Sequence, residues 1–229
     1  DSAHPFHDWN ERITAECYGP NTAARILDDE GRIEEIVNNY SRISFNFGPT
    51  LLTWMERHQP EIHAAVVASD RLGQKRFSGH GPAMAQPWCH LIMPLASLRD
   101  KRTQVRWGIA DFRRRFGRAP EGMWLPEAAV DTETLEVLAE HGILFTVLAP
   151  RQALRVRPLA EKAWHDVSDG RVDPTIPYRC NLPSGRHIAL FFYDGPIAQD
   201  LAFGGLLSSG EGFARRLEGT FPAEPGGPR

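Results

Sequence analysis

Cysteine is scarce in this sequence, and the few cysteines are not paired. The three cysteines, Cys17, Cys89 and Cys180, are odd in number and include no CxxC spacing. A disulfide framework needs an even set of closely spaced cysteines in an oxidising compartment, so this pattern argues against one. The sequence therefore predicts three buried, reduced thiols and a cytoplasmic location.

Several other signals are also absent. No run approaches the ~20 apolar residues of a membrane-spanning helix, which argues against a membrane partner. The formal net charge of −3 provides no basic excess, so nucleic acid is not an expected partner. Nucleotide-binding glycine loops, GxSxG and HExxH do not occur, and the one close histidine pair, His4 and His7, falls in an irregular segment. The sequence thus predicts no metal and no cofactor.

The hydrophobic content, 41% of 229 residues, is enough for one sizeable core.

Residues 1–19 are predicted to be irregular because His4, Pro5 and Pro20 interrupt any period. Residues 42–47 alternate apolar and polar side chains, which predicts a short strand. Pro49 is well placed as the first residue of a helix. Residues 61–77 fit a helix or a buried strand, and the helix is favoured.

A regular alternation of helices and strands follows. Helix 100–116, capped by Asp100 and ended by Gly117, carries one apolar stripe. Then come strand 122–125, helix 131–141 and two apolar strands, 143–150 and 188–195. The run 143–150 is apolar throughout, which predicts burial on both faces of a parallel sheet. The pattern indicates an α/β fold, either a barrel or a doubly wound sheet.

Glu127 is the leading candidate for chemistry. In α/β folds the functional side chains follow the carboxyl ends of the strands, and Glu127 comes directly after strand 122–125. Pro126 restricts the backbone before it, and Trp124 could shape a pocket or stack on a sugar. The alternative is a carboxylate that stabilises the positive end of the following helix.

Other polar groups are weaker candidates for substrate binding. Asn46 and Asp194 also stand at strand ends, although Asp194 could simply form an Asp-Gly turn. His80 lies between two glycines that would allow close approach to a ligand, but it could equally be an ordinary turn residue. His90 adjoins an apolar run, where a core histidine is the commoner outcome.

A cluster near the start of the chain completes the candidate set. Trp9, Asn10 and Glu11 combine one aromatic face with two hydrogen-bonding groups. Each of them could instead cap a helix or pack locally.

The sequence also resembles a known family. Residues 8–27, 38–54 and 79–143, including the string GMWLPE at 122–127, strongly resemble glycoside hydrolase family 57. The resemblance is greatest to the branch with DUF3536-type C-terminal regions. It implies an incomplete (β/α)7 TIM-like barrel of parallel strands that acts on α-glucans such as starch, glycogen or maltooligosaccharides, with retention of configuration.

The resemblance also implies roles for particular residues. Glu127 matches the family's nucleophile, and the run from His90 to Pro94 resembles a His–Pro segment that faces the site. His80 matches a position expected near the substrate. Hydrolysis, transglycosylation and branching remain open, as does the oligomeric state.

Two family features are missing. The first motif is absent, because His58-Gln59-Pro60 ends a predicted helix and not a strand. The acid/base Asp belongs to a DGE motif, and Asp194-Gly195 is followed by Pro196. We therefore expect residues 1–229 to be part of a single barrel domain that lacks its first and last strands, with the acid/base beyond Arg229.

Two other functions stay open. A polysaccharide deacetylase would share an irregular β/α barrel but needs a metal held by Asp and a spaced His pair, which this sequence lacks. A non-catalytic glucan-binding module would need no catalytic carboxylate, and Glu127 is the feature that argues against it.

Overall fold

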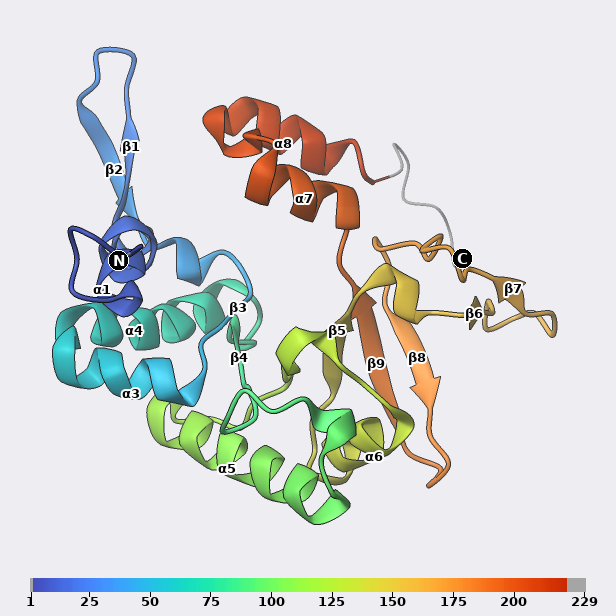
Figure 1. Cartoon of the computed structure of the whole chain (residues 1–229). Helices are drawn as coiled ribbons and strands as arrows, with labels where there is room; N and C mark the ends of the chain where they lie inside the picture. The colour runs from blue at the N-terminus through green and yellow to red at the C-terminus, as the bar shows by residue number, and fades with distance from the viewer. Residues whose placement is uncertain (1, 222–229) are drawn as a thin grey trace.

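The computed structural model describes residues 2–221 (Figure 1). Its α-helices are α1 (Trp9–Ile13), α2 (Gly19–Thr22), α3 (Pro49–His58), α4 (Pro60–Arg76), α5 (Leu98–Phe116), α6 (Thr132–Glu140), α7 (Gly195–Phe203) and α8 (Gly210–Glu218). Its strands are β1 (Ala24–Leu27), β2 (Ile33–Val37), β3 (Phe45–Asn46), β4 (Ala83–Met84), β5 (Phe145–Leu148), β6 (Arg155–Val156), β7 (His165–Asp166), β8 (Tyr178–Asn181) and β9 (His187–Phe192).

Parallel pairing runs through the centre of the molecule. β3 pairs with β4 and β5 pairs with β9, both in parallel. The segment 122–125 joins the two pairs through parallel bridges from Met123 to Ala85 and from Gly122 to Phe145. The predicted strand at 122–125 is therefore extended and paired on both sides, although only through isolated bridges. Helices alternating with parallel strands confirm the α/β class.

Helices cover one face of these strands. Met123 and Leu125 are fully buried in a core shared with α5 and α6, whereas Phe191 on the opposite face is 38% exposed. The prediction that 143–150 is buried on both faces is wrong, because burial alternates along β5 between half-buried and buried residues.

Helix α5 begins earlier than its sequence pattern indicated. The Oγ of Ser97, not Asp100, caps it by accepting a hydrogen bond from the Asp100 N–H at 3.2 Å. Asp100 lies in the first turn and accepts the Ser97 hydroxyl hydrogen bond at 2.7 Å. The Ser97 hydroxyl thus provides a hydrogen-bond partner for one of the unpaired N–H groups in the first turn of the helix. Gly117 ends α5 with a φ of 71°, as predicted.

The N-terminal segment is more regular than expected. Asp8 caps α1 by accepting from the Glu11 N–H at 3.0 Å, and a π-helical turn (Thr14–Tyr18) continues into α2. The prediction of an irregular segment is confirmed for residues 2–8 but is wrong from Trp9 on. Pro20 does not interrupt the helical turns, because it lies in the first turn of α2, where its missing N–H costs nothing. Pro60 likewise opens α4, so residues 61–77 are helical almost throughout, as favoured.

The thiols are also less buried than predicted. Cys17 and Cys89 are exposed, and Cys180 is half-buried, where burial raises the pKa of its thiol. All three are free. No described helix is both long and apolar enough to cross a membrane.

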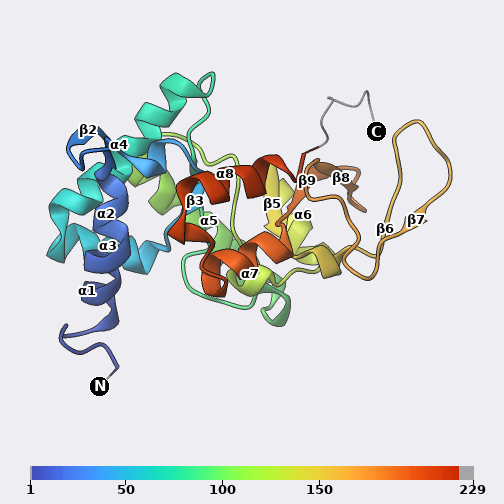
Figure 2. The ribbon, with the colours of Figure 1, turned by 90° about the horizontal axis from the view of Figure 1, so that it is seen from above.

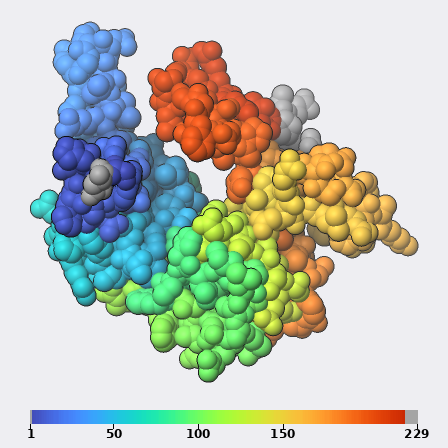
Figure 3. All heavy atoms as spheres, in the orientation of Figure 1, coloured from blue at the N-terminus to red at the C-terminus, as the bar shows by residue number. Residues whose placement is uncertain are grey.

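Two projections rise from the upper side of the molecule. The β1–β2 hairpin stands on one side, and α7 with α8 stands on the other (Figure 1). Seen from above, α7 and α8 lie over the central strands (Figure 2). Figure 3 shows the surface hollowed between the hairpin and these two helices.

A buried ion pair fixes β4 against the helices. Asp70 on α4 is fully buried and accepts two hydrogen bonds from Arg118, at 2.7 and 2.8 Å. Its Oδ1 also accepts from the Ala83 N–H at 3.0 Å, and Arg118 donates to the Ala83 carbonyl at 2.9 Å. The pair thus holds both backbone groups of the first residue of β4.

We expect Asp70→Ala to destabilise the protein by about 3–5 kcal/mol, because it leaves Arg118 and the Ala83 N–H without their partner. Urea unfolding would measure the loss. Arg71→Ala, at the adjacent exposed position, should change the free energy of unfolding by no more than about 0.5 kcal/mol. Equal effects of the two substitutions would contradict this role for Asp70.

Candidate active site

Glu127 lies in a strained turn at the carboxyl end of segment 122–125. The 3-10 turn Pro126–Ala128 gives Glu127 a φ of 57° and Ala128 a φ of 51°. Non-glycine residues seldom adopt this left-handed region, and each such residue costs on the order of 1–3 kcal/mol. Strain of this kind concentrates at functional sites, where the surrounding structure compensates for it. The alternative prediction, that Glu127 belongs to the first turn of the next helix, is wrong, because α6 begins at Thr132.

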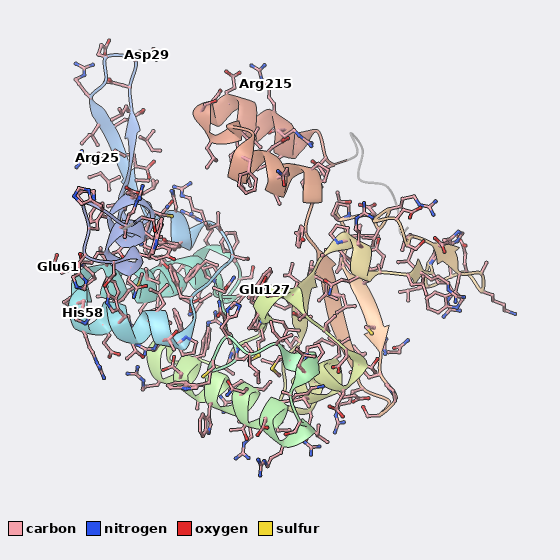
Figure 4. All side chains as sticks on the ribbon, in the orientation of Figure 1. Arg25, Asp29, His58, Glu61, Glu127 and Arg215 are labelled. Carbon is pink, nitrogen blue, oxygen red and sulfur yellow. The ribbon has the colours of Figure 1, made fainter. Side chains whose placement is uncertain are left out.

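His90 contacts the Glu127 carboxylate. The Nε2 of His90 lies 2.9 Å from Oε1 of Glu127, although 37 residues separate them. Both side chains are open to solvent, with exposed fractions of 68% and 69%. His90 is therefore not a core histidine, and the two groups form an accessible His–carboxylate pair (Glu127 is labelled in Figure 4).

Helix α5 anchors the loop that carries His90. The Trp88 N–H donates to the backbone carbonyl of Gln104 at 3.1 Å, and the Cys89 N–H donates to the side-chain Oε1 of Gln104 at 2.8 Å. Gly108 lets the helix approach, because a Cβ there would lie 2.0 Å from the Gln86 carbonyl oxygen. The position of His90 thus depends on close contact between its loop and α5.

Asn46 lies at the same edge of the sheet, with an unexpected partner. It ends β3, and its Oδ1 accepts a hydrogen bond from Gln86, which follows β4. Gln86 was not among the predicted site residues, although it lies just beyond a strand, as Asn46 does. Parallel strands bring these amides to the edge where Glu127 lies.

Trp124 and Asp194 keep their predicted positions. Trp124 is half-buried, and it alternates with Met123 and Leu125, which point into the helix-covered core. Asp194 follows β9 at the carboxyl edge, but its Oδ1 accepts from the Ile197 N–H at 2.9 Å and so caps α7. One carboxylate oxygen of Asp194 therefore has a structural role.

His80 is not brought near Glu127. It precedes β4, and its Nδ1 lies 2.8 Å from Oε1 of Glu121, which precedes segment 122–125. Both residues therefore lie at the amino ends of the parallel strands. Glu127 follows the carboxyl end of the same segment, at the opposite edge.

The N-terminal candidates also lie apart. Trp9, Asn10 and Glu11 are in α1, beside α3 and α4 and on the far side of the molecule from β5 and β9 (Figures 1 and 2). Trp9 stacks under the Arg12 guanidinium at 5.1 Å, and Glu11 accepts from the His7 N–H at 3.1 Å. These contacts stabilise the local helix.

Two cavities of about 500 and 570 Å³ flank β8, and Tyr178 and Arg179 line both. Glu127 lines neither of them. Within residues 2–221, no group of three or more His, Cys, Asp or Glu side chains is arranged to hold a metal ion.

The chain beyond Glu127 is anchored by Asp131. This residue caps α6 by accepting from the Thr134 N–H at 2.7 Å. Its other oxygen accepts from Lys101 at 2.8 Å, and Lys101, only 1% exposed, also contacts Glu133 at 2.8 Å. Burial alone would raise the pKa of the Asp131 carboxyl, but hydrogen bonds from Lys101 and Thr134 hold it below its usual value.

The described residues form an α/β protein. Glu127 places a carboxylate on a strained turn at the carboxyl edge of its parallel strands, which is where the active sites of such enzymes lie. The family model of glycosyl hydrolase family 57 matches residues 13–224, and the chain belongs to this family. Alpha-amylase 1 of Dictyoglomus thermophilum is 29% identical over 106 residues, which are 46% of this chain and 15% of that protein.

Solved structures show the same fold. An exo-type maltose-forming amylase from Pyrococcus sp. ST04 matches with a TM-score of 0.62 at 18% identity, covering 94% of this chain and 31% of that one. A 4-alpha-glucanotransferase from Thermococcus litoralis matches with a TM-score of 0.53 at 20% identity, covering 78% and 25%. The chain thus spans less than a third of the length of each relative.

Lys101→Met should destabilise the protein by about 2 kcal/mol at pH 7, because it removes the cation that bonds Asp131 and Glu133. The lowered pKa of Asp131 contributes stability above the ordinary carboxyl pKa, and this contribution is lost as pH falls through the lower folded value. The difference between wild type and variant should therefore shrink as pH falls below about 4.

Urea unfolding at pH 7, 5 and 3 would measure this difference. Lys75→Met, at an exposed position in the last turn of α4, is the matched control and should show no such pH dependence. A Lys101→Met effect of equal size at pH 7 and pH 3 would argue against the ion pair.

Proposed function

We propose that this chain forms part of the catalytic domain of a retaining enzyme that acts on α-glucans, with Glu127 as its nucleophile. The observation that carries the proposal is the accessible Glu127–His90 pair on a strained turn at the carboxyl edge of the parallel strands. The family match and the names of the relatives support the substrate class. The narrower branch with DUF3536-type regions stays a prediction.

The geometry suits a nucleophile. One oxygen of Glu127 contacts His90, while the other makes no hydrogen bond with any described residue. The free oxygen can approach an anomeric carbon from the open edge of the sheet. His90 restricts rotation of the carboxylate, and fixed orientation lowers the entropic part of the barrier.

The reaction would then proceed in two steps. Glu127 attacks the anomeric carbon and forms a glycosyl-enzyme, which water resolves by hydrolysis or a sugar hydroxyl resolves by transfer. Retaining enzymes need a second carboxyl about 5–5.5 Å from the first. The family resemblance assigns that role to a DGE motif that this chain lacks, so the proposal covers the nucleophile only.

The same proposal extends to the architecture and the substrate contacts. The parallel series from β3 to β9 is part of an incomplete (β/α)7 barrel in one domain, of which 1–229 is a portion. Asn46, Gln86 and Trp124 are the described side chains best placed for sugar contacts. Three free thiols fit a reducing compartment such as the cytoplasm.

The full-length gene product should convert maltoheptaose into other maltooligosaccharides, resolved by chromatography. Shorter products alone indicate hydrolysis, and longer products indicate transfer. Glu127→Gln keeps the size of the side chain but removes its negative charge, and should lower kcat at least about 10³-fold, which corresponds to about 4 kcal/mol in the barrier. His90→Ala should lower kcat by about 10²-fold.

His80→Ala is the matched control, because it removes a similar His–Glu contact at the opposite edge of the strands and should retain activity within about twofold. Activity that persists in Glu127→Gln would contradict the assignment of the nucleophile. Glucan binding without turnover by the wild type would instead support a binding module.

A further inference from the structure

The turn that carries Glu127 is not held by local hydrogen bonds alone. Within it, the Ala128 N–H donates to the Leu125 carbonyl at 2.9 Å, and the Ala129 N–H donates to the Pro126 carbonyl at 3.0 Å. These bonds close the turn. They do not connect it to the neighbouring strand, and two consecutive left-handed residues are easily relaxed without such a connection.

A distant side chain makes this connection. The Nε2 of Gln152 donates to the Ala128 carbonyl at 2.7 Å, across 24 residues of sequence. Its Oε1 accepts from the Ala149 N–H, also at 2.7 Å. Ala149 directly follows β5, and Gln152 ends the 3-10 turn Pro150–Gln152. One amide therefore joins the Glu127 turn to the end of β5, and we call this bridge the Gln152 clamp.

The chemistry of the clamp requires an amide. The Ala149 N–H needs an acceptor, and the Ala128 carbonyl needs a donor, so the two contacts together assign the oxygen and nitrogen of Gln152. An ionised carboxylate of the same shape can accept from Ala149 but only repels the Ala128 carbonyl. A methionine of similar size can do neither.

We infer that Gln152 is a positioning residue for Glu127: it acts through the Ala128 carbonyl to keep the carboxylate in its strained, accessible orientation. The inference rests on the proposed function for its catalytic consequence. The side chain of Gln152 hydrogen-bonds to backbone groups of the turn and of the strand end, not to the Glu127 carboxylate, so its role is to position the turn.

Hydrogen exchange tests the clamp without reference to activity. In Gln152→Met, the amides of Ala128 and Ala129 should exchange at least about tenfold faster than in the wild type, because the turn opens more often. Amides of α5 and β9 should be unaffected. Gln59→Met is the matched control, because Gln59 lies between His58 and Glu61, which Figure 4 shows at the left edge of the molecule, away from Glu127 near its centre.

Kinetics on maltoheptaose tests the consequence. Gln152→Met should lower kcat by about 10- to 100-fold with KM changed less than about threefold, since a misplaced nucleophile weakens the chemical step more than binding. A loss of global stability alone would not separate kcat from KM in this way.

Gln152→Glu adds a readout that a purely structural role would not change. A neutral carboxylic acid can both donate to the Ala128 carbonyl and accept from the Ala149 N–H, whereas the ionised form cannot. The ratio of variant to wild-type kcat should therefore be low at pH 7.5 and rise severalfold toward pH 5. Gln152→Met should show a flat ratio.

The outcomes separate the two proposals. Unchanged exchange at Ala128 and Ala129 in Gln152→Met would overturn the clamp whatever the activity. Faster exchange with an unchanged kcat in an active enzyme would overturn the positioning role. Faster exchange in a protein whose wild type has no activity on glucans would support the clamp and count against the proposed function.

Discussion

Close packing of α5 against the strand ends is the constraint on which the rest of the structure depends. Gly108 has no side chain, so the helix can rest on the backbone at Gln86, and a Cβ would come within 2.0 Å of that carbonyl oxygen. Glycine inside a helix costs about 0.5–1 kcal/mol, which this contact must offset. With the helix so close, Gln104 reaches the backbone of Trp88 and Cys89 and fixes the loop that presents His90.

The same packing explains why polar side chains gather at one edge. Met123 and Leu125 point into the core beneath α5 and α6, and the buried Pro126 begins the turn that carries Glu127 to the exposed edge. Parallel pairing then aligns the carboxyl ends of the neighbouring strands with this point. Asn46, Gln86 and Glu127 reach the same edge from separate parts of the chain.

Local sequence patterns predicted part of this arrangement. The apolar stripe of α5, the existence of α6 and the placement of Glu127 after an apolar segment each depend on residues within one element, so sequence periodicity was sufficient to predict them. The exact start of α5 was not predictable from Asp100 alone, because Ser97, three residues earlier, supplies the cap and Asp100 lies in the first turn.

The remaining features depend on contacts between distant segments. His90 and Glu127 are 37 residues apart, and Gln152 reaches the turn across 24 residues. A short stretch of sequence, over which helix and strand patterns are recognised, therefore contains neither pair. One-sided burial of β5 was missed for the same reason: an apolar run shows that a strand is hydrophobic but does not show how many of its faces helices cover.

Two of the accessible His–Glu pairs among residues 2–221 lie at opposite edges of the same parallel strands, and their comparison shows what distinguishes a candidate site. His80–Glu121 and His90–Glu127 have nearly equal separations, 2.8 and 2.9 Å, and both histidines are 68% exposed. The chemistry of the pair therefore cannot distinguish them. The backbone does distinguish them. Glu121 precedes its strand segment without a positive φ, whereas Glu127 follows the segment in a strained turn that the Gln152 amide holds in place. Strain that is maintained by a specific contact, at the edge where parallel strands present their carboxyl ends, is the feature on which the proposed role of the Glu127–His90 pair rests.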